Sequence, residues 1–579
     1  MTSTRTKRSS TARKKATKKK TSEMSPWTSL STLIECGKKS PYLWSLPAGI
    51  VTHAVADRLS GWCAASTQKK AFTQEALADF QTWLQTDAEP HALEAVHALQ
   101  GLWLVKKLVD EGQEELSEQV VARAEKVQRD GADSTTETAW HQFLCEVELP
   151  LALAAVGHKT KISTKGLGQS IQGLIDEICD TDGVPHSSHL AYLRPILGSW
   201  VRSLAYASHL GIDLRKKKLQ TLYDSFFEQC LRFSTFEKHA MGCEPSDFDF
   251  SKRMFQLGLE YCQSEDAPLL AGGALGVGAK PTISTLDGLV TASAHSEWGS
   301  IALLRTHWTR MASKLLLDYE AATFDCHLDT FKSVLKGNWD LRIDKDGKPL
   351  SPESDWSLVC WHDDDDGIYI ELERSYSGGC RVQRQIFLGS EDSILFSGDA
   401  VFFEEPCEWD YRSSLPLGPG VELIGAEDSR EGHLVHHDEN GATTNLGLVI
   451  PLSLPEWRQE SVDAGLQQEG RELIHFGHRS RARGYFPLFV DLNPVRSQNA
   501  LTWRRLTVGE SLEICTDDVA VAFRVQVGHE QWVFYRALNG ISNRTFFGQN
   551  LFADFYAGQF DTDGQMNELI SINEEDDAI

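Results

Sequence analysis

The chain has 579 residues, of which 41% are hydrophobic and 24% charged, and its formal net charge is −25. This composition excludes fibrous and wholly disordered proteins. No uncharged apolar run of about 18 residues occurs, which excludes a membrane-spanning helix. The N-terminus lacks the apolar run of a secretory signal peptide, and the cysteines form no C-x-x-C pair. We therefore expect reduced thiols and a cytoplasmic protein.

The charge is divided unevenly along the chain. Residues 1–22 contain nine Lys or Arg and no acid, so the remaining 557 residues carry −34. Residues 1–25 have almost no apolar side chain and are expected to be disordered. The basic side chains of residues 5–20 predict contact with nucleic acid through phosphate neutralisation, with a solubilising tail as the alternative. Residues 571–579 are expected to form a solvated acidic tail.

Residues 26–320 show the apolar spacing of helices, at three or four residues. We expect helical hairpins stacked in an array or a closed ring. The Gly-rich segment Leu270–Gly278 is expected to be a flexible loop between helices. The clearest helical stripes are Phe72–Leu84, His91–Val109, Gln113–Val127, Trp140–Val156, Gly168–Cys179, Leu190–Leu210, Lys218–Phe233, Lys252–Cys262 and Gly299–Leu317.

Residues 321–570 have a different pattern, with short segments rich in Val, Ile, Phe, Trp and Tyr between turn signals. About a dozen such segments predict a large antiparallel β-sandwich. The predicted fold class is therefore multidomain α+β, with a helical domain followed by a β-sandwich. The clearest strands are Trp356–Trp361, Gly367–Glu373, Cys380–Leu388, Ser393–Phe403, Leu446–Leu452, Glu472–Gly477, Phe486–Asp491, Ser511–Cys515, Val519–Val527 and Gln531–Tyr535.

The first candidate site is DGVPHSSHLAY, residues 182–192. If a helix begins near Ser187, His189 and Tyr192 lie at positions i and i+3 on one face, close to His186. A tyrosine beside a histidine can act as an acid/base pair in proton abstraction. The alternative is that Tyr192 packs into the helical core while the histidines face solvent.

The second candidate site is CHLD, residues 326–329. His327 and Asp329 would share one face of a strand, which suits joint metal ligation or a His–carboxylate pair. Asp344 and His362 can add ligands after a hairpin. The sequence thus favours a surface histidine near a domain junction here, with a structural divalent metal as the alternative.

Three stretches rich in aromatic residues and arginine can line a carbohydrate-binding face: Pro455–Arg458, Leu501–Leu506 and Gln531–Arg536. Aromatic faces stack on sugar rings, and guanidinium forks hold carboxylates or sulfates. The alternative is that these strands pack one face into the sandwich core. The sequence contains no phosphate-binding G-x-x-x-x-G-K-[ST] loop, G-x-S-x-G elbow or H-E-x-x-H motif.

Two segments resemble the heparinase II/III-type polysaccharide lyases. DGVPHSSHLAYLRPILGSWVRSL (182–204) is similar to the family segment that carries a catalytic tyrosine on a helix. Residues 300–339 resemble the arginine-containing helix that leads into the family's H-x-H-x-D motif, of which His327 and Asp329 are present and the first His is missing. The resemblance implies an incomplete (α/α) toroid followed by a β-sandwich.

The resemblance also implies β-elimination on a uronate-containing polysaccharide. Tyr192 would be the base and the acid, and His186 or His189 would neutralise the uronate or share the role of base. The uronate-gripping residues would be Arg194, Arg202 and Arg305, with His327, Asp329 and Asp344 as structural or metal-binding residues. Two alternatives stay open: an inactive carbohydrate-binding or scaffold protein on the same fold, and an intracellular interaction protein whose basic arm contacts nucleic acid.

Overall fold

The structure is a computed structural model that describes residues 27–34, 40–47, 52–67, 74–86, 91–132, 138–245, 247–248, 250–286, 288–320, 323–561 and 563–573. The basic segment of residues 5–20 lies outside the described residues, so its contact with nucleic acid stays a prediction. The acidic run of residues 574–577 lies outside them as well. No helix in the described part is long and apolar enough to cross a membrane.

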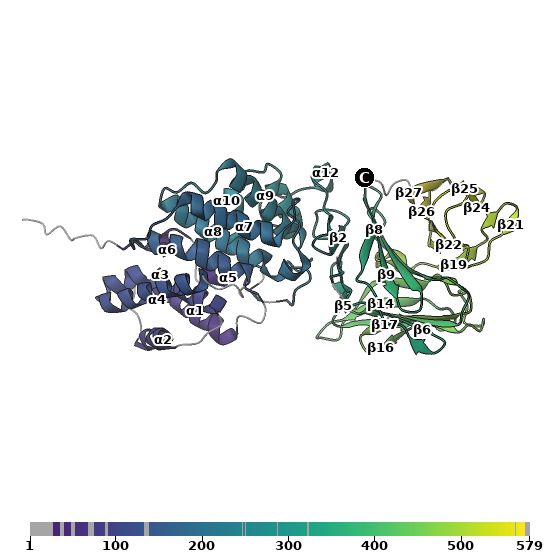
Figure 1. Cartoon of the computed structure of the whole chain (residues 1–579), viewed down its shortest axis with the longest axis horizontal. Coiled ribbons are helices and arrows are strands. Elements are labelled where there is room, and N and C mark those ends of the chain that lie inside the picture. Colours follow the sequence, from purple (N-terminus) through teal and green to yellow (C-terminus); the bar gives the residue numbers. More distant parts are fainter. Residues whose placement is uncertain are drawn as a thin grey trace, which may run out of the picture.

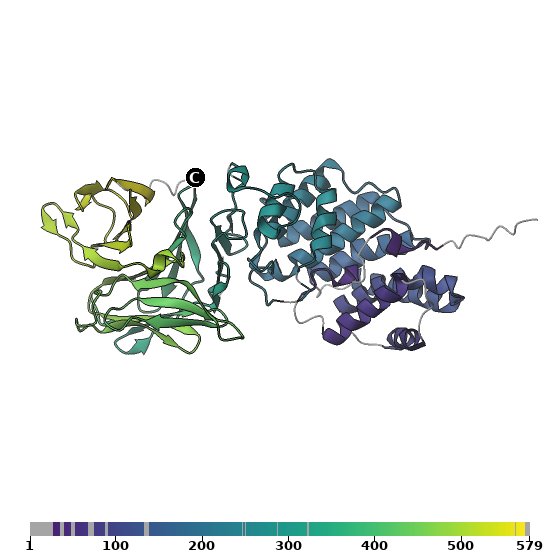
Figure 2. The ribbon, with the colours of Figure 1, turned by 180° about the vertical axis from the view of Figure 1, so that it is seen from behind.

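The N-terminal half of the molecule is helical and forms one lobe (Figures 1 and 2). Its large apolar side chains meet in one core, in which Leu99, Trp103 and Trp200 are almost fully buried. The α-helices are α1 (His53–Thr67), α2 (Gln74–Gln85), α3 (His91–Asp110), α4 (Glu114–Ala132), α5 (Ala139–Phe143), α6 (Leu149–Ala155), α7 (Thr164–Ile178), α8 (Leu193–His209), α9 (Lys217–Arg232), α10 (Lys252–Tyr261), α11 (Ala267–Leu275) and α12 (Ile283–Leu286). Short 3-10 helices are η1 (Leu30–Thr32), η2 (Pro41–Leu43) and η4 (Ser187–Tyr192), and η3 (Leu144–Glu148) is a π-helical turn.

The prediction of a flexible loop at Leu270–Gly278 is wrong, because most of this segment belongs to the buried helix α11. Its glycines serve close packing: a Cβ on Gly272 would lie 2.0 Å from the carbonyl oxygen of Ala279. Gly276 then ends the helix in the left-handed conformation, at φ 66°. Glycine here permits a close approach of backbones rather than a mobile loop.

A five-stranded antiparallel sheet lies between the helical lobe and the rest of the β half (Figure 1). Its strands, paired in chain order, are β1 (Ala294–Ser296), β2 (Ile301–Arg305), β3 (Lys314–Asp318), β4 (Asp325–Asp329) and β5 (Ser333–Asn338). The helix predicted at Gly299–Leu317 is therefore wrong, and strands begin at Ala294 rather than near residue 320. Both faces of this sheet are buried: Leu303 and Leu316 pack into the helical core, whereas Leu304 and Leu315 pack into the sandwich core. Such strands read as continuous apolar runs without alternation, which periodicity does not separate from a helix.

The predicted antiparallel sandwich follows. An eight-stranded sheet, in the order β13-β14-β15-β18-β11-β10-β9-β8, and a five-stranded sheet, in the order β16-β17-β12-β6-β7, enclose the second core. The strands are β6 (Asp340–Lys345), β7 (Lys348–Pro349), β8 (Ser357–Asp363), β9 (Gly367–Tyr376), β10 (Cys380–Gly389), β11 (Ile394–Phe403), β12 (Trp409–Pro416), β13 (Val421–Gly425), β14 (Gly432–His437), β15 (Thr443–Pro451), β16 (Ala464–Glu469), β17 (Glu472–Arg479) and β18 (Arg483–Asp491).

Two further sheets complete the C-terminal end of the molecule. The third core lies between the eight-stranded sheet and a sheet in the order β19-β22-β23-β26-β27. A small sheet, in the order β21-β20-β24-β25, covers part of that sheet's outer face. The elements are η5 (Arg496–Gln498), β19 (Leu501–Leu506), β20 (Gly509–Glu510), β21 (Glu513–Ile514), β22 (Ala520–Val527), β23 (Glu530–Ala537), β24 (Arg544–Phe546), β25 (Gln549–Leu551), β26 (Phe555–Phe560) and β27 (Met566–Ile572).

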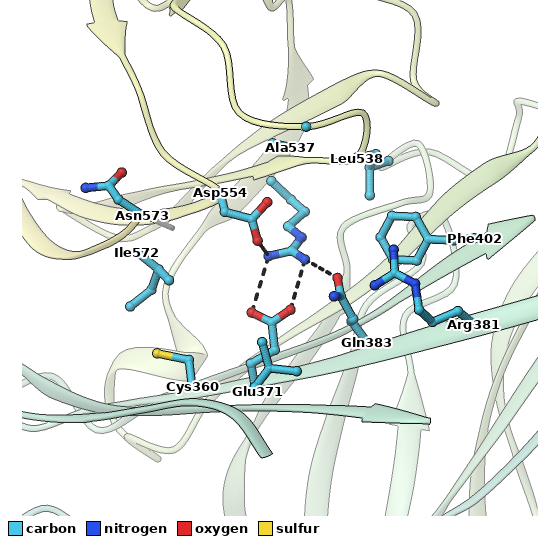
Figure 3. Close-up of a pocket in the computed structure, with 13 residues that line it drawn as sticks. Cys360, Glu371, Arg381, Gln383, Phe402, Ala537, Leu538, Asp554, Ile572 and Asn573 are labelled. Carbon is cyan, nitrogen blue, oxygen red and sulfur yellow. Dashed lines mark hydrogen bonds and ion pairs between the residues drawn. The ribbon is translucent and has the colours of Figure 1, made fainter. Parts of the chain in front are cut away.

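A buried ionic network joins the eight-stranded sheet to the C-terminal sheet, beside a cavity of about 290 Å³ (Figure 3). The fully buried guanidinium of Arg536 on β23 donates to Glu371 on β9, at 2.9 Å, to Gln383 on β10, and to Asp554. Removing two charges from water is costly unless they are paired and hydrogen-bonded. Four hydrogen bonds to three partners engage both terminal nitrogens of Arg536, so the network fixes the position of one sheet against the other.

Candidate functional site

The short helix η4 presents the first candidate residues. A turn at Gly183, with φ 79°, leads into it, and Asp180 closes this turn by accepting hydrogen bonds from the backbone N–H groups of Asp182 and Val184. His186 is the N-cap residue, and its Nδ1 accepts from the Ser188 amide at 3.3 Å. Because a 3-10 helix has three residues per turn, positions 186, 189 and 192 fall into one row.

Residues that lie next to strands β1, β2 and β3 contact this row of side chains. The His186 and His189 rings are 6.0 Å apart, and the Trp298 ring packs edge-on against His186 at 5.1 Å. Trp298 lies between β1 and β2 and is 53% exposed. Glu320 lies 3.9 Å from His186 Nδ1 and accepts a hydrogen bond from Ser187. We call His186, His189, Tyr192, Trp298 and Glu320 the η4 site.

The protonation state of His189 follows from its surroundings. Partial burial, and then the neighbouring His186, lower the pKa of His189. Its Nδ1 is buried and has no hydrogen-bond partner among the described residues. Tyr192 is half-buried against the helical core, and its hydroxyl forms no hydrogen bond within the described part of the chain. The site thus holds an imidazole with a lowered pKa and a tyrosine side chain in one row, but not in direct hydrogen-bond contact.

The other faces of η4 line two adjoining cavities. The larger one, of about 360 Å³, lies at the junction of the helical lobe with the β half and includes Ser187, Leu190, Lys336 and Arg471. The second, of about 300 Å³, shares Ser187 and Leu190 with it. We call the larger one the junction cavity.

The carboxyl groups of Asp318, Asp325 and Glu244 line the junction cavity. Asp318 on β3 and Asp325 on β4 are direct cross-strand partners, and both line the cavity. Burial raises the pKa of each carboxyl above its ordinary value. Two neighbouring carboxyls with raised pKa values can serve acid/base chemistry or accept hydrogen bonds from sugar hydroxyls.

The predicted sugar-gripping residues Arg194 and Arg202 are buried and bound internally. Arg202 on α8 forms a two-point ion pair with Glu148, at 2.6 and 2.9 Å, in the helical core. Arg194 donates to the Lys238 carbonyl at 2.7 Å and to Ser234 at 2.8 Å, although it also borders the smaller cavity. The structure therefore does not bring either guanidinium to the η4 site.

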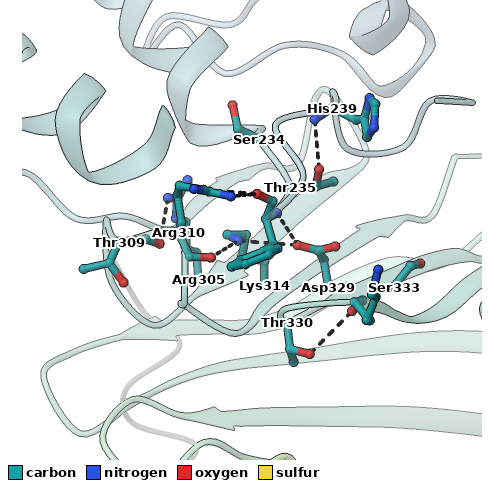
Figure 4. Close-up of polar contacts among 12 residues, drawn as sticks. Ser234, Thr235, His239, Arg305, Thr309, Arg310, Lys314, Asp329, Thr330 and Ser333 are labelled. Carbon is teal, nitrogen blue, oxygen red and sulfur yellow. Dashed lines mark hydrogen bonds and ion pairs between the residues drawn. The ribbon is translucent and has the colours of Figure 1, made fainter. Parts of the chain in front are cut away.

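Arg305, the third predicted sugar-binding residue, lies where the first sheet meets the helical lobe (Figure 4). It is 1% exposed and donates to backbone carbonyls, including Arg232 at 2.7 Å and Trp308 at 3.1 Å. Burial and the charge of Arg232 lower its pKa to about 9. Arg305 thus fastens the helical lobe to β2.

The predicted metal ligands do not come together. His327 and Asp329 lie on β4, whereas Asp344 lies on β6 in another sheet, paired with Arg342 at 2.8 Å. His327 Nδ1 accepts from the Gly242 amide at 3.3 Å. Asp329 accepts from the Phe236 amide at 2.7 Å and from the Lys314 amine at 3.4 Å (Figure 4).

No group of three or more metal-ligating side chains occurs among the described residues. Both potential donors on β4 already accept hydrogen bonds, and the ammonium group of Lys314 stands where a cation would bind Asp329. The residues present therefore do not fit the predicted divalent metal. They connect β4 to the backbone of the helical lobe instead.

The structure brings together a second His–Tyr pair, which no sequence pattern indicates. His295 Nε2 and the Tyr319 hydroxyl are 2.9 Å apart, and the Trp361 ring stacks on His295 at 4.9 Å. Burial lowers the pKa of His295 to about 4 and raises that of Tyr319. No sequence signal identified the pair, because its members are 24 residues apart and β1 and β3 are not paired with each other.

The aromatic and arginine-rich stretches divide between core and surface. Trp503 and Trp532 are buried in the third core, and Arg536 is buried in the network of Figure 3. Trp457 and Arg504 are exposed. The expectation of sandwich packing is thus met by the tryptophans of β19 and β23, while some of the polar side chains face solvent.

Comparisons with known proteins support the architecture. No family model matches the sequence, and no curated protein matches it either. Among solved structures, heparinase III is similar over 84% of this chain and 82% of its own, with a TM-score of 0.57 and 11% identity. The heparan sulfate lyase HepC from Pedobacter heparinus is similar over 84% and 82%, with a TM-score of 0.54 and 8% identity. At such identity the likeness concerns the fold, and this chain has the polysaccharide lyase fold of a helical toroid followed by antiparallel β-sheets.

Proposed function

We propose that this protein is a polysaccharide lyase that cleaves a uronate-containing polysaccharide by β-elimination, with the η4 site as its centre. The observation that supports it is the row of His186, His189 and Tyr192 beside the exposed Trp298, in a chain with the polysaccharide lyase fold. The two solved structures reported above are named for heparinase and heparan sulfate lyase activity, which suggests an acidic polysaccharide as substrate.

The proposed chemistry assigns a role to each group. A base takes the proton from C5 of the uronate, the bond from C4 to the glycosidic oxygen breaks, and a C4=C5 double bond forms. Tyr192, acting as the phenolate, takes the C5 proton, and the phenol so formed gives that proton to the leaving glycosidic oxygen, which restores the phenolate. His189, neutral because its pKa is lowered, and His186 bind the uronate carboxyl and limit the charge that develops beside C5.

Substrate binding can bring Tyr192 and the histidines into contact through the bound sugar. Catalytic hydrogen bonds are often long or absent before substrate arrives, so the missing contact between Tyr192 and His189 does not exclude their cooperation. The exposed indole of Trp298 offers a face for a sugar ring next to the histidines. Arg194, Arg202 and Arg305 are buried and bound elsewhere, whereas Lys336 and Arg471 line the junction cavity. Lys336 pairs with the exposed Glu244 at 3.3 Å, and Arg471 donates to the Leu417 carbonyl. We propose that these two cations exchange part of these contacts for a neighbouring uronate.

The test is the ultraviolet absorbance of unsaturated uronate after incubation with heparan sulfate, alginate and related polymers. We expect Tyr192→Phe and His189→Gln to lower kcat at least a hundredfold, because each removes a proton-transferring or neutralising group. His437→Gln is the matched control, since this exposed histidine lies on β14 and contacts Glu422. Unchanged rates in both site variants would contradict the assignment.

A second candidate function is binding of the same polysaccharide without cleavage. Arg202 and Arg305 donate to partners inside the protein, and the Tyr192 hydroxyl forms no hydrogen bond within the described residues. Both features favour binding without cleavage. In that case no polymer yields absorbance, while binding measured by calorimetry is present and falls in a Trp298→Ala variant. Absence of both absorbance and binding would contradict both candidate functions.

A further inference from the structure

Two arginines face each other on the outer surface of the C-terminal sheet. Arg504 on β19 and Arg524 on β22 are direct cross-strand partners. Their neighbours Trp503 and Val525 point into the third core, so both guanidinium groups are on the opposite, outer face. Like charges placed directly opposite on a sheet repel each other and destabilise the pair.

No described carboxylate neutralises this pair. Neither arginine has an ion-pair partner within the described residues, and the donors of Arg524 go to the side-chain oxygens of Gln531 and Gln526. Burial, and then the charge of Arg504, lower the pKa of Arg524. Arg505, the next residue on β19, differs because it pairs with Asp517. An unneutralised pair of cations is notable in a chain whose net charge is −25.

An exposed aromatic ring lies next to Arg524 of this pair. Phe547 occupies the two-residue turn between β24 and β25, is 47% exposed, and lies 5.8 Å from the guanidinium of Arg524. Its φ is 51°, a left-handed conformation in which such turns prefer Asn or Gly. Strained positions of this kind concentrate at binding and catalytic sites. A small polar side chain would adopt this backbone conformation at a lower energetic cost than the phenylalanine that the turn carries.

We propose that Arg504, Arg524, Gln526 and Phe547 form a second saccharide-binding site, which takes a sugar bearing carboxylate or sulfate groups. The guanidinium forks hold the anionic group through paired hydrogen bonds, the amide of Gln526 meets a hydroxyl, and the ring of Phe547 stacks on the sugar. We call these four residues the arginine face. The assignment rests on the substrate class of the proposed function and is independent of cleavage.

The chemistry favours a saccharide over other anionic partners. Guanidinium and amide groups on the outer face of the C-terminal sheet, with the aromatic ring of the adjoining turn, match the alternating anionic, hydroxyl and apolar surfaces of a uronate chain. An anion between Arg504 and Arg524 removes their mutual repulsion, which gives the bound state an advantage that neutral sugars lack. The arginine face lies on the C-terminal sheet and the turn beside it, whereas the η4 site lies where the helical lobe meets the first sheet. One long polysaccharide chain can therefore occupy both sites only if it extends across the sandwich.

The test is binding of immobilised heparan sulfate and alginate, measured by biolayer interferometry as a function of salt with the full chain. We expect the double variant Arg504→Gln/Arg524→Gln to bind at least tenfold more weakly and with a shallower dependence on salt. Phe547→Asn should also weaken binding at least threefold without lowering Tm, since asparagine suits its backbone conformation. Arg505→Gln is the matched control and should stay within twofold of the wild type.

The outcomes separate this proposal from the catalytic one. Loss of product absorbance in Tyr192→Phe with unchanged binding, together with weakened binding in the double arginine variant, supports both. A chain without lyase activity whose binding still depends on Arg504 and Arg524 supports the arginine face alone. Equal loss in Arg505→Gln, unchanged binding in the double variant, or binding only to anionic lipid vesicles would overturn the proposal.

Discussion

At the scale of single residues, burial decides what a charged group does. Arg202 and Glu148 are both almost fully removed from water and satisfy each other at two points. A pair of this kind contributes little in itself, but removal of one member leaves the other buried without a partner. The role of Arg202 is therefore structural. From the sequence alone, an arginine next to a candidate catalytic segment suggests substrate binding instead.

We expect Arg202→Met to lower the free energy of unfolding by about 3–5 kcal/mol, because Glu148 would remain buried and unpaired. Urea denaturation followed by circular dichroism measures this change. Arg412→Met, which breaks an exposed pair with Glu469, is the control and should cost less than about 1 kcal/mol. Equal costs for the two variants would refute the structural role of Arg202.

The buried His475 gives a prediction for the dependence of stability on pH. Its side chain is fully buried and its Nδ1 has no hydrogen-bond partner among the described residues, and burial lowers its pKa to about 3. The unfolded chain binds a proton near pH 6.5, whereas the folded chain does not. Stability is therefore fully present above pH 6.5 and is lost as the pH falls towards 3, at about 1.4 kcal/mol per pH unit.

In the variant His475→Phe we expect a smaller loss of stability between pH 6.5 and pH 4 than in the wild type. The measurement is urea denaturation at several pH values, compared by slope because the substitution also changes packing. The same slope in both proteins would show that His475 does not carry this part of the acid sensitivity.

Residue roles were the least predictable feature of the candidate site. The spacing predicted that His189 and Tyr192 share one face of a helix beginning near Ser187, and the helix does begin there, because such spacing is a local property. The fate of each arginine depends on partners such as Glu148, which is 54 residues away from Arg202 in the sequence. Likewise, the pairing of His295 with Tyr319 arises only when the sheet forms.

At the scale of elements, two misassignments share one cause. The sheet containing β2 and β3 is buried on both faces, and helix α11 packs its glycines against neighbouring backbone. In both places tertiary contacts replace the polar face on which periodicity depends. Elements with one face in water, such as α4 and α7, were predicted with bounds within a few residues of those observed.

The packing of α11 leads to a test with a built-in contrast. We expect Gly272→Ala to lower stability by about 1–3 kcal/mol, because its Cβ would clash with the Ala279 carbonyl. Gly173→Ala, in the middle of α7 with open space around it, should raise stability by about 0.5–1 kcal/mol. Thermal unfolding of both variants measures the difference, and a stabilising Gly272→Ala would mean that α11 is not held closely.

At the scale of the whole molecule, the change from helical to strand patterns predicted the order of the two halves. The sequence did not predict that the first sheet lies between two cores, because the boundary depends on which residues face the helices. The overall charge also matters at this scale: an acidic body repels polyanions at long range. Any acidic substrate must therefore be bound by local cations, such as Lys336 and Arg471 in the junction cavity or the arginine face.

The most direct test of the proposed lyase is a crystal structure of the Tyr192→Phe variant with a uronate oligosaccharide. We predict a sugar ring against Trp298, with the uronate carboxyl within hydrogen-bond distance of His186 or His189. The scissile glycosidic bond should lie next to the side chain at position 192. An oligosaccharide bound elsewhere, with the η4 site empty at saturating concentration, would contradict the account.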